Sequence, residues 1–144
     1  MTRIEFHFNT AERLQHTCRL LRKARSQDLR IAVLGASATL RQLDSALWSF
    51  SASDFLPHST AADDPEVQAV SPVFLATETQ GLGHFDVLVN LGDDVPLGFD
   101  RFERLIEIVA NDDHGRAQAR ERWKHYKFLG FDLLQHDLSK KSES

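Results

Sequence analysis

The sequence contains little cysteine and no long apolar segment. Cys18 is the single cysteine among 144 residues, which excludes an intrachain disulfide framework and a cysteine-rich zinc site. No segment approaches the roughly 20 consecutive apolar residues of a membrane span, and no apolar stretch typical of a secretory signal follows the first residues. We therefore expect a cytoplasmic, soluble protein with no membrane partner, in which Cys18 is a half-buried structural thiol on a helix.

An excess of positive charge is also missing. The chain has 17 lysines and arginines against 21 aspartates and glutamates, a formal net charge of -4. This balance argues against a protein whose whole surface binds nucleic acid, although it is compatible with a local basic patch. The length and the 42% hydrophobic content suit one globular domain with a single core.

Motifs for catalysis and for cofactors are absent as well. The loop at residues 35–39 has neither the three glycines of a dinucleotide fingerprint nor the lysine of a P-loop. No pair of histidines stands at metal-ligand spacing among His7, His16, His58, His84, His114, His125 and His136. We therefore expect no enzyme activity, no cofactor and no metal site. A nucleotide-dependent enzyme is suggested only by the fold class.

Apolar runs of strand length alternate with segments of helical periodicity. Strands are expected at residues 4–8, 31–34, 73–76 and 86–91, with a short strand or edge segment at 55–58. Helices are expected from Asn9 or Thr10 to about 27, from Ser37 or Thr39 to Trp48, over 99–103, and from about 114 to 129. Residues 59–71 are expected to form a surface loop.

This alternation predicts an α/β fold, a single Rossmann-like domain with a mostly parallel sheet flanked by helices. The domain is expected to cover residues 1–136, and residues 137–144 to form a polar, flexible tail. Asn111, Asp112 or Asp113 can cap the final helix, and Gly130 is expected to end it.

The final helix carries the strongest functional signal. Four cations recur at steps of four, four and three residues, which places them on one stripe of the helix: Arg116, Arg120, Lys124 and Lys127. Arg122 lies off this stripe, while Trp123 and Tyr126 place aromatic surface beside it.

Three interpretations of this pattern stay open. Cations near a helix C-terminus stabilise the helix dipole, and a tryptophan–tyrosine pair often only packs in the core. Cations beside an apolar pocket also suit a peptide that ends in a hydrophobic residue and a free carboxylate. The same combination suits single-stranded nucleic acid, so a direct single-stranded nucleic-acid-binding module is an alternative that periodicity does not exclude.

Two passages resemble a known family. Residues 119–127, Ala-Arg-Glu-Arg-Trp-Lys-His-Tyr-Lys, followed by Gly130 and Phe131, resemble the C-terminal helix of the chi subunit of bacterial DNA polymerase III. Residues 43–48, Leu-Asp-Ser-Ala-Leu-Trp, and then 55–58, Phe-Leu-Pro-His, resemble the second helix of that family and the strand after it. The order of these blocks, their separation and the chain length also match.

The resemblance implies a non-catalytic adaptor that binds the acidic C-terminal tail of single-stranded DNA-binding protein, which ends in proline and phenylalanine. It also implies a link to the clamp loader through the psi subunit, with only indirect contact to DNA. Carried over by position, the tail-binding residues are Val109, Arg116, Arg120, Trp123 and Lys124. Trp123 stands where the family often has tyrosine, which leaves its detailed role open.

The psi-binding residues implied by the resemblance form a second group. They are Trp48, Phe55, Leu56, Pro57 and His58. Trp48 also fits the core face of its own helix, so a role in packing is the alternative for it.

Overall fold

The protein is described from a computed structural model of the chain. The structure describes residues 1–50, 58–60, 63–64, 66, 71–83 and 85–139. In chain order its elements are β1 (Arg3–Phe8), α1 (Arg13–Ser26), β2 (Ile31–Leu34), α2 (Ser37–Phe50), β3 (His58–Thr60), β4 (Val73–Ala76), β5 (Val87–Asn90), the 3-10 helix η1 (Phe99–Arg101), β6 (Arg104–Ile108), α4 (Asp113–Phe128) and β7 (Leu133–Asp137). None of the helices described is long and apolar enough to cross a membrane.

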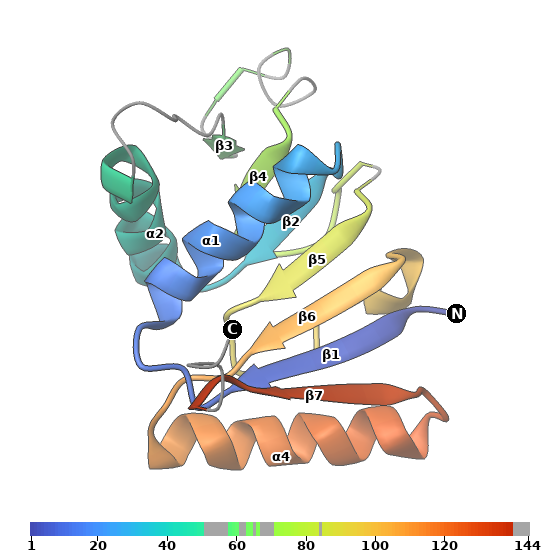
Figure 1. Cartoon of the computed structure of the whole chain (residues 1–144). Helices are drawn as coiled ribbons and strands as arrows, with labels where there is room; N and C mark the ends of the chain where they lie inside the picture. Colours follow the sequence, from blue (N-terminus) through green and yellow to red (C-terminus); the bar gives the residue numbers. More distant parts are fainter. Residues whose placement is uncertain (51–57, 61–62, 65, 67–70, 84, 140–144) are drawn as a thin grey trace.

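The described strands form one sheet in the order β3-β4-β2-β5-β6-β1-β7 (Figure 1). Every neighbouring pair in it is parallel. The interior strands β4 and β5 are buried at every position, as expected where both faces of a parallel sheet are covered. The predicted α/β fold with a Rossmann-like arrangement is therefore confirmed.

Helices α1 and α2 pack on one face of the sheet, and α4 packs on the other (Figure 1). Leu21 of α1 and Leu43 of α2 share one apolar cluster with Val33, whereas Tyr126 of α4 shares the second cluster with Phe6. The chain crosses the sheet in opposite directions from β1 to β2 and from β6 to β7. Because such crossovers are right-handed, α1 and α4 are placed on opposite faces.

Cys18 lies in the cluster between α1 and the sheet and is fully buried. Burial raises the pKa of its thiol to about 11, so the group stays protonated near neutral pH. The structure therefore places the thiol deeper than the half-buried position expected for it, and its role is packing.

The start of α1 differs from the expectation. The helix begins at Arg13 after an extended Glu12, so neither Asn9 nor Thr10 caps it. Asn9 instead adopts a positive φ of 59°, and its side-chain amide donates to Asp137 at 3.0 Å. The turn after β1 is thus held by the far end of the chain, a partner that local sequence signals do not reveal.

The sheet contains two strands that were not among those expected from the sequence, β6 and β7, and it extends a third, β3. β7 pairs in register with β1 at the edge of the sheet, although its residues were assigned to no element. β3 includes Ser59 and Thr60, which were expected in the surface loop. Asp137 is the last residue of β7, and the domain boundary at residue 136 stays a prediction.

Candidate functional site

Helix α4 is fixed at both ends by its own sequence. The Asp112 side chain accepts a hydrogen bond from the Gly115 amide at 2.6 Å and caps the N-terminus, as predicted for this acidic cluster. Gly115 is required there because an added Cβ would lie 2.7 Å from the backbone oxygen and the Cβ of Ala110. At the other end Gly130, at φ 93°, donates to Lys127 while the Phe131 amide donates to the Tyr126 carbonyl. This pair of bonds is a Schellman motif, and the predicted stop at Gly130 is confirmed.

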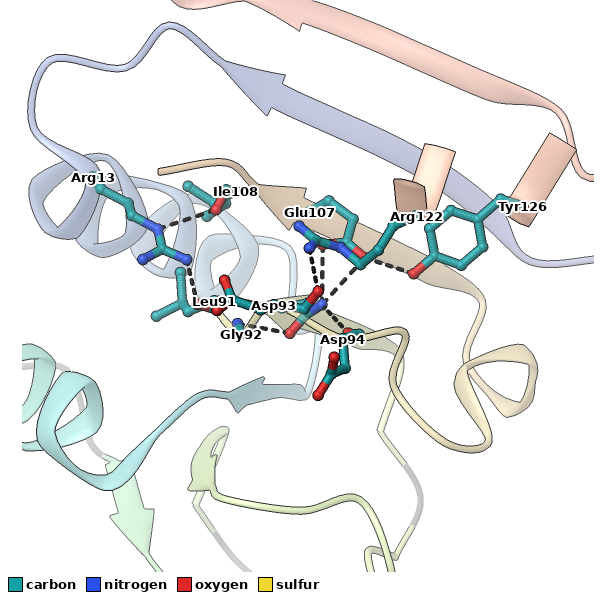
Figure 2. A network of polar contacts seen from close by, with 10 residues as sticks. Arg13, Leu91, Gly92, Asp93, Asp94, Glu107, Ile108, Arg122 and Tyr126 are labelled. Carbon is teal, nitrogen blue, oxygen red and sulfur yellow. Dashed lines mark hydrogen bonds and ion pairs between the residues drawn. The ribbon is translucent and has the colours of Figure 1, made fainter. Parts of the chain in front are cut away.

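The inner side of α4 is held to the sheet by a buried polar network (Figure 2). Glu107 of β6 is completely buried and accepts from Arg122 Nε at 3.0 Å and from the Tyr126 hydroxyl at 2.6 Å. Asn90 of β5 donates to the same carboxylate at 3.0 Å, and a second nitrogen of Arg122 donates to the carbonyl of Asp93 at 2.6 Å. Arg122 therefore lies off the cation stripe because it faces inward.

The pKa values in this network follow from burial. Burial raises the pKa of Glu107, while the charge of Arg122 and the hydrogen bonds from Tyr126 and Asn90 oppose that rise. Burial, and then the neighbouring Glu107, raise the pKa of Tyr126, so its hydroxyl stays protonated and donates. Arg13 completes the carboxyl end of the sheet by donating to the carbonyls of Ile108, at 3.1 Å, and Leu91 (Figure 2).

The side of α4 that faces β1 and β7 borders a pocket of about 330 Å³. Strand β1, the end of β6, helix α4 and strand β7 supply its lining, which consists of Phe6, Phe8, Val109, Arg116, Ala119, Arg120, Trp123 and Gln135. The Trp123 ring packs edge-on against Phe6 with 5.2 Å between ring centroids. The pocket thus combines an apolar floor with two guanidinium groups on one rim.

Four of the five residues predicted to bind a peptide tail meet at this pocket, namely Val109, Arg116, Arg120 and Trp123. Arg116 is already oriented by Asn111 at 2.7 Å and by Asp113 at 3.0 Å. Arg120 is exposed, and in the described part of the chain its side chain has neither an ion pair nor a hydrogen bond.

Lys124, the fifth predicted residue, does not line the pocket. Its side chain is 73% exposed and lies 3.4 Å from Glu121 on the same helix. A pocket lined by aromatic and aliphatic groups can hold an apolar side chain, and paired guanidinium groups can hold a carboxylate. Arg116 and Arg120 are placed for that role, and Lys124 stands outside it.

Four lining residues were absent from the predicted site, namely Phe6, Phe8, Ala119 and Gln135. Phe6 and Phe8 alternate along β1, a pattern that shows a buried face but not what covers it. Gln135 comes from β7, a strand that was missed. Helix α4 gives the cation stripe its direction, but part of the pocket floor comes from Phe6 and Phe8, which lie more than 100 positions before Arg116 in the sequence.

Of the residues predicted to bind psi, Trp48 and His58 are described, and His58 begins β3 at the edge of the sheet opposite β7. Trp48 is 61% exposed on α2, so it does not pack in the core as the alternative required. Its ring lies 5.8 Å from that of His58 at the start of β3, and His58 in turn contacts Asp44 at 2.6 Å. Phe55, Leu56 and Pro57 lie outside the described residues.

The sequence matches a family model described as "DNA polymerase III chi subunit, HolC" over residues 1–134. The chain belongs to this chi subunit family. The resemblance noted in the sequence is therefore confirmed, and this chi-family member is an accessory subunit of a replicative DNA polymerase.

Curated relatives of this chi-family chain share the family name. The DNA polymerase III subunit chi of Pseudomonas aeruginosa is 34% identical over 143 residues, which cover 96% of this chain and 98% of that one. The subunit of Escherichia coli is 32% identical over 93 residues, 64% of this chain and 62% of that one. The subunit of Haemophilus influenzae is 28% identical over 99 residues, covering 68% and 67%.

Solved structures of proteins with little sequence similarity share the fold of this chi-family member. The C-terminal domain of the DEAD-box protein Dbp5 superposes with a TM-score of 0.63 at 13% identity, covering 99% of this chain and 93% of that domain. The corresponding S. cerevisiae domain with the L327V substitution, bound to Gle1 and IP6, gives a TM-score of 0.57 at 10% identity, with the same coverage. At such low identity the likeness concerns the fold alone.

Proposed function

We propose that this chi-family member binds the acidic C-terminal tail of single-stranded DNA-binding protein in the pocket beside α4. The observation that supports this proposal is the joining of an apolar floor, made by Phe6, Val109 and Trp123, with a rim made by Arg116 and Arg120. A peptide that ends in phenylalanine presents one apolar side chain and one carboxylate at the same end. The pocket offers a matching group for each of them.

The charge distribution supports the same ligand. The chain is acidic as a whole, so an acidic peptide is repelled by the average surface and must be held by a local cluster of cations. Such a cluster stands at the pocket and continues along the exposed stripe to Lys124 and Lys127. Acids upstream of the terminal residue can contact this continuation, but each such contact adds little affinity, because exposed charge pairs are screened by water and salt.

The proposed role is that of a tether rather than a catalyst. Contact with DNA is indirect, through a single-stranded DNA-binding protein that presents several tails. Linked tails raise the effective concentration and hold the polymerase assembly at the template, even where each contact is weak. The exposed Trp48 beside His58 supports, as part of this proposal, a separate surface for psi and hence a link to the clamp loader.

Fluorescence-anisotropy titration tests the proposal directly. The probe is a labelled acidic peptide ending in Asp-Phe-Pro-Phe, and the control is the same peptide without its final phenylalanine. We expect saturable binding of the first peptide and a large loss with the second, because the truncated peptide no longer fills the apolar floor. Equal binding of the two peptides, or no binding of either by folded protein at low salt, would overturn the assignment.

Direct binding of single-stranded DNA is the rival outcome, and Lys127→Ala separates it from peptide capture. Lys127 lies on the exposed stripe but not in the lining of the pocket. A nucleic-acid backbone that follows the stripe would use Lys127 as much as Arg120, and its binding would fall steeply with salt. Capture of a peptide end instead predicts loss of affinity in Arg120→Ala and near-normal affinity in Lys127→Ala.

A further inference from the structure

The sheet face opposite α4 gathers a second set of polar side chains. Glu5 and His7 point from β1 onto this face, and His136 of β7 stands in register beside His7. The two strands are the first and the last of the sheet in the order of the chain, so sequence spacing could not reveal this convergence. The cluster has no role in the tail-binding pocket, which lies on the other face.

The distances within this cluster match those between the ligands of a metal ion. The Oε1 atom of Glu5 lies 3.5 Å from Nε2 of His7 and 3.3 Å from Nε2 of His136, and all three atoms lie within 4.8 Å of one another. Ligands about 2.0–2.1 Å from a tetrahedral zinc ion are separated by roughly 3.3 Å from one another. Two of the three separations therefore already have the value that coordination requires.

Neighbouring groups hold two of the three ligands in place. Nδ1 of His7 lies 2.8 Å from Nε2 of His16 on α1, and this contact orients the His7 ring. With the proton on Nε2, His7 donates to Glu5; with the proton on Nδ1, the lone pair of Nε2 is directed at the cluster and can bind a metal. Arg104 contacts Oε2 of Glu5 at 2.8 Å and leaves Oε1 for a metal. Such outer partners fix the orientation and the tautomer of metal ligands in known sites.

We propose that Glu5, His7 and His136 form a binding site for a divalent transition-metal ion of the zinc type. Two imidazoles and one carboxylate suit this class of ion, and three protein ligands leave a fourth position. That position faces a groove of about 460 Å³ between α1 and the sheet, which the same three residues help to line. The bound ion joins β7 to β1 and so fixes the C-terminal edge of the sheet.

The surrounding charges limit the strength of this site. Arg104 lies against the carboxylate, and Arg19 and Lys23 of α1 line the same groove. These cations repel a divalent ion, while the single carboxylate attracts it. We therefore expect one zinc ion per chain with a dissociation constant in the micromolar range, well short of the affinity of a structural zinc finger.

Zinc titration of the untagged, full-length protein tests the site. Isothermal calorimetry should give one binding event, and zinc should raise the melting temperature by a few degrees. In His136→Ala and in Glu5→Gln the affinity should fall by roughly tenfold or more, since each removes one of three ligands. The control is His125→Ala, which removes an exposed histidine on α4 and should leave zinc affinity unchanged.

His136→Ala is the decisive variant because the residue is half exposed and its replacement leaves the core intact. Cobalt(II) adds a spectroscopic readout, because a tetrahedral site with two imidazoles gives intense visible absorption. Absence of zinc binding by the folded wild-type protein overturns the proposal. Binding that survives unchanged in both His136→Ala and Glu5→Gln overturns it too. Because the peptide titration uses the opposite face, either result leaves the proposed tail-binding function independently testable.

Discussion

The two faces of the sheet each bury one glutamate, and the two carboxylates have opposite surroundings. Glu107, under α4, is sealed from solvent, and burial raises its pKa despite three donors. Glu5, on the other face, is 6% exposed, and its pKa falls to about 2. Burial raises the pKa of Glu5 too, but hydrogen bonds from His7 and Arg104 and the Arg104 charge outweigh that effect.

The contrast shows what each face is built to do. Under α4 the Glu107 carboxylate accepts hydrogen bonds from Arg122 and Tyr126 and so holds the helix on the sheet. On the α1 side the helix packs over β2 and β5, and a groove lies between it and the β1 and β7 edge, where His136 is half exposed and His7 is buried. Two residues of helix α4 show the same contrast: Arg122 is 5% exposed and bonded to Glu107, while Arg120 is exposed and lines the pocket proposed to bind the peptide.

Arg122→Ala should have the largest effect. Its removal leaves the Glu107 carboxylate buried without a cation, so we expect a loss of roughly 3–5 kcal/mol in the free energy of unfolding. Urea denaturation followed by circular dichroism measures it. Arg120→Ala on the same helix is the matched control and should change stability by less than about 0.5 kcal/mol. Equal stability of the two variants would contradict the division of α4 into a structural and a ligand-binding side.

Acid should weaken the α1 face through Glu5. A carboxyl whose pKa falls from 4.5 unfolded to about 2 folded contributes stability above pH 4.5 and loses it as the pH falls towards 2. The ionised Glu5 carboxylate contributes up to roughly 3 kcal/mol to the free energy of unfolding. Urea denaturation at several pH values should show Glu5→Gln less stable than wild type at pH 6, where Arg104, His7 and His136 face the carboxylate. The difference in the free energy of unfolding between the two proteins should become smaller by pH 3. A difference that does not change with pH would contradict the role of the ionised carboxylate.

Trp123→Ala should weaken binding of the acidic peptide by about 2 kcal/mol or more, because the ring walls the apolar part of the pocket. Anisotropy titration measures the change. The matched control is Trp48→Ala, which truncates the other tryptophan, exposed on α2, and should leave peptide affinity intact. If both variants bind peptide as wild type does, the pocket is not the binding site. If only Trp48→Ala loses affinity, the peptide binds at the surface near β3 instead.

Arg120→Ala should cost roughly 1.5 kcal/mol of peptide affinity, the loss of one charge-assisted contact to the terminal carboxylate. The amidated peptide supplies a second comparison. Amidation should remove most of the difference between wild type and Arg120→Ala, since no terminal carboxylate is left to bind. A difference that persists with the amidated peptide would place Arg120 against an upstream acid instead.

The sequence predicted the fold class, the ends of α4 and half of the residues that line the pocket, for physical reasons. Apolar runs, an acidic cap before Gly115 and a glycine after the last turn are local signals, and they were sufficient there. Residues on one helix keep their relative directions wherever the helix docks, so Arg116, Arg120 and Trp123 could be grouped from spacing alone.

What could not be predicted depends on strands that are distant in sequence. β7 has only two apolar residues at its start and lies half exposed at an edge, so its pattern is weak until β1 is known to be its neighbour. Gln135 of the pocket and His136 of the histidine cluster were missed for this one reason. The helical spacing placed Arg122 off the cation stripe but did not reveal its partner, because Arg122 meets Glu107 only when α4 packs on β6.

Lys124→Ala should have the smallest effect, and it marks where spacing along a helix stops being informative. The residue shares the stripe with Arg120, yet its ammonium group is 73% exposed and lies near Glu121 rather than in the pocket. An exposed contact of this kind is worth less than about 1 kcal/mol and should vanish at high salt. Anisotropy titrations of Lys124→Ala and Arg120→Ala, at low and at high salt, measure the difference. Equal losses in the two variants at both salt concentrations would mean that the peptide runs along α4 beyond the pocket, and that the sequence stripe, rather than the pocket lining, defines the site.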